Sequence, residues 1–171
     1  MSLALERITT QYIEAEDRIR LSGSTRDGHS QVLWLTQRLL SRLLPRLLDA
    51  LQPSAPATRL ASQPPQDEWQ SWLQAAARDS LQQQAPVPTD NAQAVWLVHA
   101  INLSLSSEAV RVAFCDETGQ ERAELTMNPT VLRQWLSIVY EGWRKAEWPA
   151  TLWPAWIRPD VSPAVDKSLW H

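Results

Sequence analysis

Leucines and arginines recur in blocks along the segment from Leu33 to Leu51, LWLTQRLLSRLLPRLLDAL. The leucines follow the 3.6-residue period of an α-helix, and on such a helix they cover about half of the circumference. Thr36 precedes the first apolar turn, and its hydroxyl can accept a bond from a free backbone N–H, so we expect it to cap the helix. A leucine face this wide is typical of a helix packed on a β-sheet.

Arginines occupy the side of this helix that the leucines leave open. They recur at every fourth position and span an arc of roughly 80°; we call the row formed by Arg38, Arg42 and Arg46 the arginine stripe. Three interpretations remain open for it. It is the solvated face of a core helix, a surface that pairs with acidic groups of a partner or of the same chain, or a contact for phosphate groups of single-stranded nucleic acid or lipid headgroups.

A later segment repeats the order of elements that surrounds this helix. Two alternating strands flank a turn at Gly28 ahead of the first helix, and a similar hairpin flanks Gly119 ahead of a helix that begins after Asn128. Segments 19–48 and 110–140 align with an offset of 91 residues through the turns and 92 through the helices. Because the match rests on pattern rather than identity, an internal duplication and a coincidence of two unrelated hairpin–helix units both remain open.

An extra alternating strand precedes each hairpin, at 7–15 and at 94–106. The sequence therefore predicts an α+β fold with two pseudo-repeated β-β-β-α units, in which helices cover antiparallel sheets. In chain order, the predicted parts are a first unit at 1–51, a Pro-rich linker at 52–91 with a helix at 67–84, a second unit at 92–146, and a C-terminal strap at 147–171. We expect these parts to pack together as one domain.

The strap is rich in tryptophan and proline. Its four prolines exclude a regular helix, and its tryptophans are too apolar for a free tail, so we expect it to lie over a hydrophobic surface of this chain or of a partner. Tryptophan is enriched among the residues that dominate protein interfaces. Three strap tryptophans are therefore candidate partner contacts, namely Trp148, Trp153 and Trp156.

Charge is unevenly distributed along the chain. Six arginines against Asp27 alone give residues 18–48 a balance of +5, so the remainder carries −8 of the net −3. No membrane span is expected, because each stripe arginine would cost roughly 2.5 to 3.5 kcal/mol at the centre of a bilayer. An acidic run at 14–17 has the features of a solvated turn rather than of a catalytic carboxylate pair.

The sequence contains no motif for catalysis, a cofactor or a metal. The four glycines form no phosphate-binding loop, and the three histidines have no metal-ligand spacing to each other or to Cys115. Asp116 and Glu117 follow Cys115, and neighbouring carboxylates make a thiol a poorer nucleophile. We therefore expect a protein that is not an enzyme, and a single cysteine favours the cytoplasm.

The leading hypothesis is a protein-interaction or assembly protein that forms a homodimer, with the arginine stripe and the strap tryptophans as contacts. The alternative is single-stranded nucleic-acid binding through residues of the first unit, namely Arg18, Arg20, Arg26 and Trp34. The order of elements over 7–48 and 94–145 resembles that of the Whirly and Pur-alpha single-strand-binding folds. That resemblance implies curved sheets that carry basic and aromatic residues.

Overall fold

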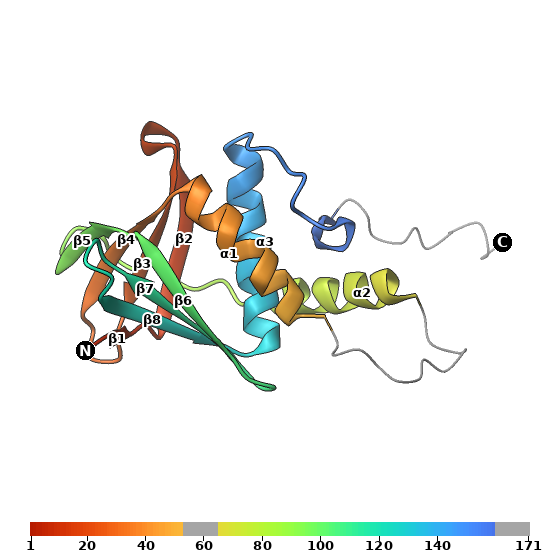
Figure 1. The fold of residues 1–171 in the computed structure, drawn as a ribbon, viewed down its shortest axis with the longest axis horizontal. Coiled ribbons are helices and arrows are strands. Elements are labelled where there is room, and N and C mark those ends of the chain that lie inside the picture. The colour runs from red at the N-terminus through yellow and green to blue at the C-terminus, as the bar shows by residue number, and fades with distance from the viewer. Residues whose placement is uncertain (53–64, 160–171) are drawn as a thin grey trace.

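The computed structural model describes residues 1–52 and 65–159 and confirms the α+β class. Within these residues, eight strands form two four-stranded sheets, and three α-helices accompany them (Figure 1). The strands are β1 (Leu3–Ala4), β2 (Arg7–Ile13), β3 (Arg18–Ser24), β4 (Ser30–Leu35), β5 (Ala94–Leu97), β6 (Ala100–Leu105), β7 (Val110–Cys115) and β8 (Glu121–Met127). The α-helices are α1 (Gln37–Ala50), α2 (Gln66–Asp79) and α3 (Pro129–Lys145), and two short 3₁₀ helices are η1 (Glu14–Glu16) and η2 (Ala155–Ile157).

Each sheet combines three strands of one unit with one strand of the other. The first sheet has the order β2-β3-β4-β5 and the second has the order β1-β8-β7-β6. In both sheets three consecutive strands are antiparallel, and the remaining edge strand runs parallel to its neighbour, β5 beside β4 and β1 beside β8. The two units are therefore interlocked rather than merely adjacent.

The element order β-β-β-β-α occurs twice, as β1 to α1 and as β5 to α3. The two edge strands taken from the other unit, β1 and β5, also have matching registers. Leu3 of β1 pairs with Ala123 of β8, and Ala94 of β5 pairs with Gln31 of β4. Leu3 and Ala94 are 91 residues apart, and Gln31 and Ala123 are 92 apart, the same offsets that align the two segments in the sequence. A common origin of the two units stays a prediction.

The strand predicted at 94–106 is wrong in one respect, because the chain changes sheets in the middle of it. The backbone N–H of Val98 donates to the carbonyl of Trp34 in the first sheet, and the next N–H, that of His99, donates to the carbonyl of Cys115 in the second. Two consecutive residues thus bond to different sheets, and the segment becomes β5 and β6.

The linking helix is also shorter than the predicted span 67–84. It ends at Asp79, and Ser80 closes it by donating its hydroxyl to the carbonyl of Ala77. The chain that follows crosses the first sheet on its way to β5, where the backbone N–H of Val87 donates to the hydroxyl of Thr9.

The cap predicted at Thr36 and the helix start predicted after Asn128 are confirmed, and Asn128 is a cap of the same kind. The Thr36 hydroxyl accepts from the N–H of Leu39 at 3.2 Å, and the Asn128 side chain accepts from the N–H of Val131 at 2.9 Å. Both hairpin turns place glycine in the left-handed region, with φ of +85° at Gly28 and +83° at Gly119.

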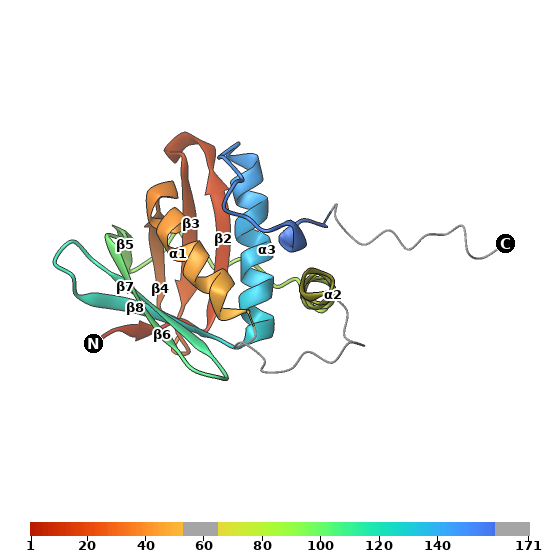
Figure 2. The same ribbon diagram turned by 45° about the vertical axis from the view of Figure 1, so that its right-hand side comes forward.

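The core lies between the sheets and the helices (Figures 1 and 2). Helix α1 contacts β6 of the second sheet, and α3 lies along β2 of the first. The leucines of α1 that face inward are Leu40, Leu43, Leu44, Leu47 and Leu48. None of the described helices is long and apolar enough to cross a membrane.

Candidate interaction surfaces

The arginine stripe is exposed along the whole of α1. Arg38, Arg42 and Arg46 all lie at the surface, and the described residues supply none of them with an ion pair or a side-chain hydrogen bond. The stripe is about 12 Å long, since it spans eight residues of helix. It is therefore an uncompensated basic row on a chain that is acidic overall.

Helix α3 does not carry an equivalent row. With the offset of 92 residues that relates the two helices, the stripe positions correspond to Thr130, Gln134 and Ile138. The single arginine in the corresponding part of α3, Arg133, is buried instead. The stripe is thus a property of the first unit alone.

An acidic turn lies between β2 and β3, and we define it as Glu14, Glu16 and Asp17, all three exposed. Asp17 adopts a left-handed conformation with φ of 49°, and its carboxylate accepts hydrogen bonds from Tyr12 and from the indole of Trp148. Partial burial raises the pKa of Tyr12, and the bond to Asp17 and the nearby carboxylates raise it further. One ion pair, from Arg18 to Glu16 at 4.0 Å, offsets part of this charge.

The acidic turn and the first turn of α1 lie at the same end of the molecule. Figures 1 and 2 both show the β2–β3 connection and the start of α1 near the top of the view. The acidic turn and the start of the helix that carries the stripe therefore lie at one end of the molecule, with no ion pair between the two among the described residues.

The strap tryptophans are covered by the chain itself. Trp148, Trp153 and Trp156 are 8%, 3% and 5% exposed. Trp143 of α3 makes edge-to-face contacts with the rings of Trp148 and Trp153, with centroids 4.9 and 5.8 Å apart. These rings therefore contribute to the core, and the part of the strap at 160–171 lies outside the described residues.

Three of the four nucleic-acid candidates come together on the outer face of the first sheet, which is the face turned away from α3. Arg20 lies directly opposite Trp34 across the β3–β4 pair. Arg18, two residues before Arg20 on β3, points to the same face. Nη2 of Arg20 donates to Gln11 at 2.8 Å, while its buried Nε has no partner among the described residues. Arg26 lies in the hairpin turn beyond the other end of β3 and does not join them.

The corresponding face of the second sheet is neutralised by acids. Nη2 of Arg111, the counterpart of Arg20, contacts Glu121 at 2.7 Å and Glu124 at 2.5 Å. These bonds lower the pKa of both glutamates and raise that of the arginine. Thr126 lies where the first sheet has Trp34. Only the first sheet therefore presents an arginine beside a tryptophan.

Cys115 lies buried on β7. Burial raises the pKa of its thiol, and the charges of Glu121 and Asp116 raise it further, so the thiolate form is disfavoured. Within residues 1–52 and 65–159, no group of three or more His, Cys, Asp or Glu side chains is arranged to hold a metal ion.

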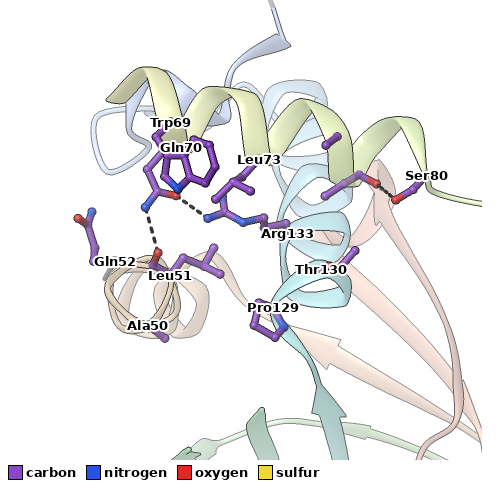
Figure 3. Close-up of a pocket in the computed structure, with 12 residues that line it drawn as sticks. Ala50, Leu51, Gln52, Trp69, Gln70, Leu73, Ser80, Pro129, Thr130 and Arg133 are labelled. Carbon is purple, nitrogen blue, oxygen red and sulfur yellow. Dashed lines mark hydrogen bonds between the residues drawn. The ribbon is translucent and has the colours of Figure 1, made fainter. Parts of the chain in front are cut away.

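One pocket was missed by the sequence analysis. It lies where the end of α1, one side of α2 and the start of α3 meet, and it has a volume of about 480 Å³ (Figure 3). Arg133 reaches from α3 toward α2 at its centre and is 5% exposed. Gln70 and Gln74, spaced by one helical turn within an otherwise apolar face of α2, are the signal that could have indicated it.

The aromatic pair Trp69 and Trp72 on α2 borders this region. Their rings stack with centroids 5.3 Å apart, and they remain 47% and 60% exposed. Trp69 lines the pocket, whereas Trp72 does not.

Comparison of the chain with protein-family models, with curated proteins and with solved structures gives no match in any of the three. The functional argument therefore rests on the geometry of these surfaces.

Proposed function

We propose that the protein is a non-enzymatic, cytoplasmic interaction protein that self-associates, with the arginine stripe of one copy against the acidic turn of a second copy. The observation that carries this proposal is the exposed stripe of Arg38, Arg42 and Arg46, which makes no ion pair among the described residues. The single buried cysteine agrees with a reducing compartment.

Charge complementarity and position favour a second copy as the occupant. The chain carries its own acidic turn, and that turn lies at the same end of the molecule as the start of the stripe. A two-fold axis at this end brings each stripe to the other copy's turn, so the same contact forms twice and the assembly closes as a dimer. Opposite charges also steer the two copies toward this orientation.

The mass of the protein in solution tests the proposal. Light scattering at 50 mM NaCl should give twice the chain mass of 19.4 kDa, and the dimer dissociation constant should rise at least tenfold at 500 mM NaCl, because salt screens exposed charges. The double variant Arg38→Glu/Arg42→Glu turns attraction into repulsion. It reverses two pairs in each of the two contacts, so four attractions of about 0.2–1 kcal/mol become repulsions of similar size. The dimer should therefore weaken by at least tenfold.

Arg26→Glu is the matched control, since this arginine is equally exposed but lies in the hairpin turn beyond the opposite end of β3. It should leave the dissociation constant within twofold of the unmodified protein. A monomer at 50 mM NaCl and 200 μM protein would sink the proposal, as would a dimer that the double variant leaves intact.

A second candidate function is favoured by the Arg20–Trp34 pair on the outer face of the first sheet. Single-stranded nucleic acid binds through basic groups that contact phosphates and aromatic rings that stack on bases, and this face offers both side by side. The chain around Val87 covers another part of the same face, so the accessible region is short.

This candidate is tested by fluorescence anisotropy with a labelled 20-nucleotide thymidine strand. Binding through Arg18 and Arg20 should give a logarithmic salt slope of about −1.4, at 0.7 per phosphate contact on a single strand. Trp34→Ala should weaken binding by one stacked base, about 1–3 kcal/mol. No binding at 20 mM NaCl removes the candidate without affecting the dimer proposal.

A further inference from the structure

We infer that the pocket between α1, α2 and α3 is a binding site for a carboxylate attached to a flat apolar group, and that Arg133 holds the carboxylate. This site is separate from the arginine stripe and independent of self-association. Four points support it: the missing counter-charge, the fixed orientation of the guanidinium, its spare donors and the walls of the pocket.

The guanidinium is buried without a carboxylate. Buried charges in proteins are ordinarily paired, because removing an ion from water costs several kcal/mol. Among the described residues Arg133 has no ion pair; its polar contacts are Gln70 Oε1 at 2.5 Å and Gln74 Oε1 at 3.4 Å, and it lies 5.4 Å from the centre of the Trp156 ring. Burial alone lowers its pKa to about 10, with no opposing charge to restore it.

Both glutamines are held in the orientation that points their oxygens at the arginine. The Gln70 amide donates to the carbonyl of Leu51 at 3.0 Å, and the Gln74 amide donates to the Arg133 carbonyl and to the Ser137 hydroxyl at 2.8 and 2.7 Å. The guanidinium is therefore positioned before any ligand arrives, which lowers the entropy cost of binding.

The two bonds to the glutamines leave donors for a ligand. A guanidinium carries five N–H groups in a planar fork that matches the two oxygens of a carboxylate. The positive end of α3 adds to the preference for an anion, because Thr130 in its first turn also lines the pocket. The opposing negative end of α1 is partly neutralised, since the Leu51 carbonyl is already bonded to Gln70.

The remaining walls are mostly apolar. Leu51, Leu73 and Pro129 line the pocket together with alanines of α2, Gln52 and Ser80 add polar groups, and the half-exposed ring of Trp69 stands at its edge (Figure 3). A volume of about 480 Å³ lies within the range of sites for small molecules. An aromatic or similarly flat group fits these walls, and its carboxylate then reaches Arg133.

The test titrates the full-length protein with three probes and follows the Arg Nε–H and Trp Nε1–H signals by NMR. The probes are 2-naphthoate, N-acetyl-L-tryptophan and the neutral N-acetyl-L-tryptophanamide. At least one acid should bind tenfold more tightly than the neutral amide and shift the signals of Arg133 and Trp69. Tighter binding of naphthoate identifies a free small acid as the source of the carboxylate, and tighter binding of N-acetyl-L-tryptophan identifies a chain end.

Two matched pairs of variants assign the contacts. Arg133→Met should abolish the preference for the acid, whereas Arg144→Met, at an exposed position on the same helix, should preserve it. Trp69→Ala should weaken binding by three- to tenfold, whereas Trp72→Ala should have a smaller effect, since Trp72 contacts Trp69 but does not line the pocket. Equal binding of acid and amide, or no shift at Arg133 with 10 mM of either acid, would overturn the inference even if Arg133→Met fails to fold.

Discussion

Replacement of Arg133 by methionine tests whether this arginine is kept for stability. The substitution removes the buried charge and retains an unbranched side chain that can fill most of the same space. A structural arginine with a buried counter-ion would be costly to remove, since breaking such a pair destabilises by about 3–5 kcal/mol. Arg133 lacks that counter-ion among the described residues, so a smaller effect is expected.

The opposing contributions can be estimated from the contacts. Burial lowers the pKa of Arg133 from 12.5 to about 10, and at 1.36 kcal/mol per pKa unit this corresponds to roughly 3 kcal/mol of destabilisation that methionine removes. Against this, Gln70 and Gln74 lose a donor, at about 1 kcal/mol each for oxygens beside a pocket. The contact with Trp156 is worth roughly another 1 kcal/mol. The net change in unfolding free energy should stay within about 2 kcal/mol.

Urea unfolding followed by tryptophan fluorescence at pH 7 measures this difference, with Arg144→Met as the control for losing an exposed arginine from the same helix. A loss of 3 kcal/mol or more for Arg133→Met would refute the reasoning. It would mean that the arginine stabilises the fold through a partner, and that its burial needs no ligand to account for it.

Four further substitutions test the local chemistry. Gly28→Ala and Gly119→Ala should each lower stability by about 1 kcal/mol, because an alanine is strained at the positive φ of these positions. The space around both glycines is open, so no steric clash adds to this strain. Equal stability to the unmodified protein in urea would contradict this. Arg111→Met should reduce the loss of unfolding free energy as the pH falls from 5 to 3. The two β8 glutamates have pKa values below the ordinary 4.5, so their contribution is present above that pH and is lost as the pH falls below it; an unchanged slope between pH 5 and 3 would contradict the assignment. Pro45→Ala should raise the thermal midpoint by restoring a backbone bond to the Ser41 carbonyl, worth about 1–3 kcal/mol, and a lower midpoint would contradict it.

Features that depend on a few neighbouring residues could be predicted from the sequence. A cap needs one side-chain oxygen and an N–H three residues later, so Thr36 and Asn128 identify the starts of α1 and α3. A hairpin turn needs one residue that tolerates positive φ, so Gly28 and Gly119 identify both turns.

Features that depend on contacts between residues distant in sequence could not be predicted. The strand β1 is two residues long, too short for a periodic pattern, and it forms only because β8 offers it a parallel edge. Apolar residues run from Ala94 to Val98 and resume at Ala100 after His99, so nothing local marks the change of sheet. The periodicity of side chains alone cannot distinguish one long strand from two consecutive strands in different sheets.

The candidate sites divide in the same way. The exposure of the arginine stripe follows from its position opposite the leucine face of α1. The burial of the strap tryptophans depends on Trp143 and Tyr140, which lie on a helix that precedes the strap and offer it a surface. The role of Arg133 could not be predicted, because its burial depends on α2, which is distant in sequence.

Self-association through the arginine stripe is tested most directly by a charge exchange between two variants. One variant is Arg38→Glu/Arg42→Glu, and the other is Glu14→Lys/Glu16→Lys, isotope-labelled to shift its mass. In a closed two-fold dimer of one with the other, both contacts regain opposite charges, whereas each variant alone faces repulsion. Native mass spectrometry should show monomers of each variant alone and a mixed dimer on combining them. Two variants that stay monomeric when combined, or that each dimerise alone, would contradict the account.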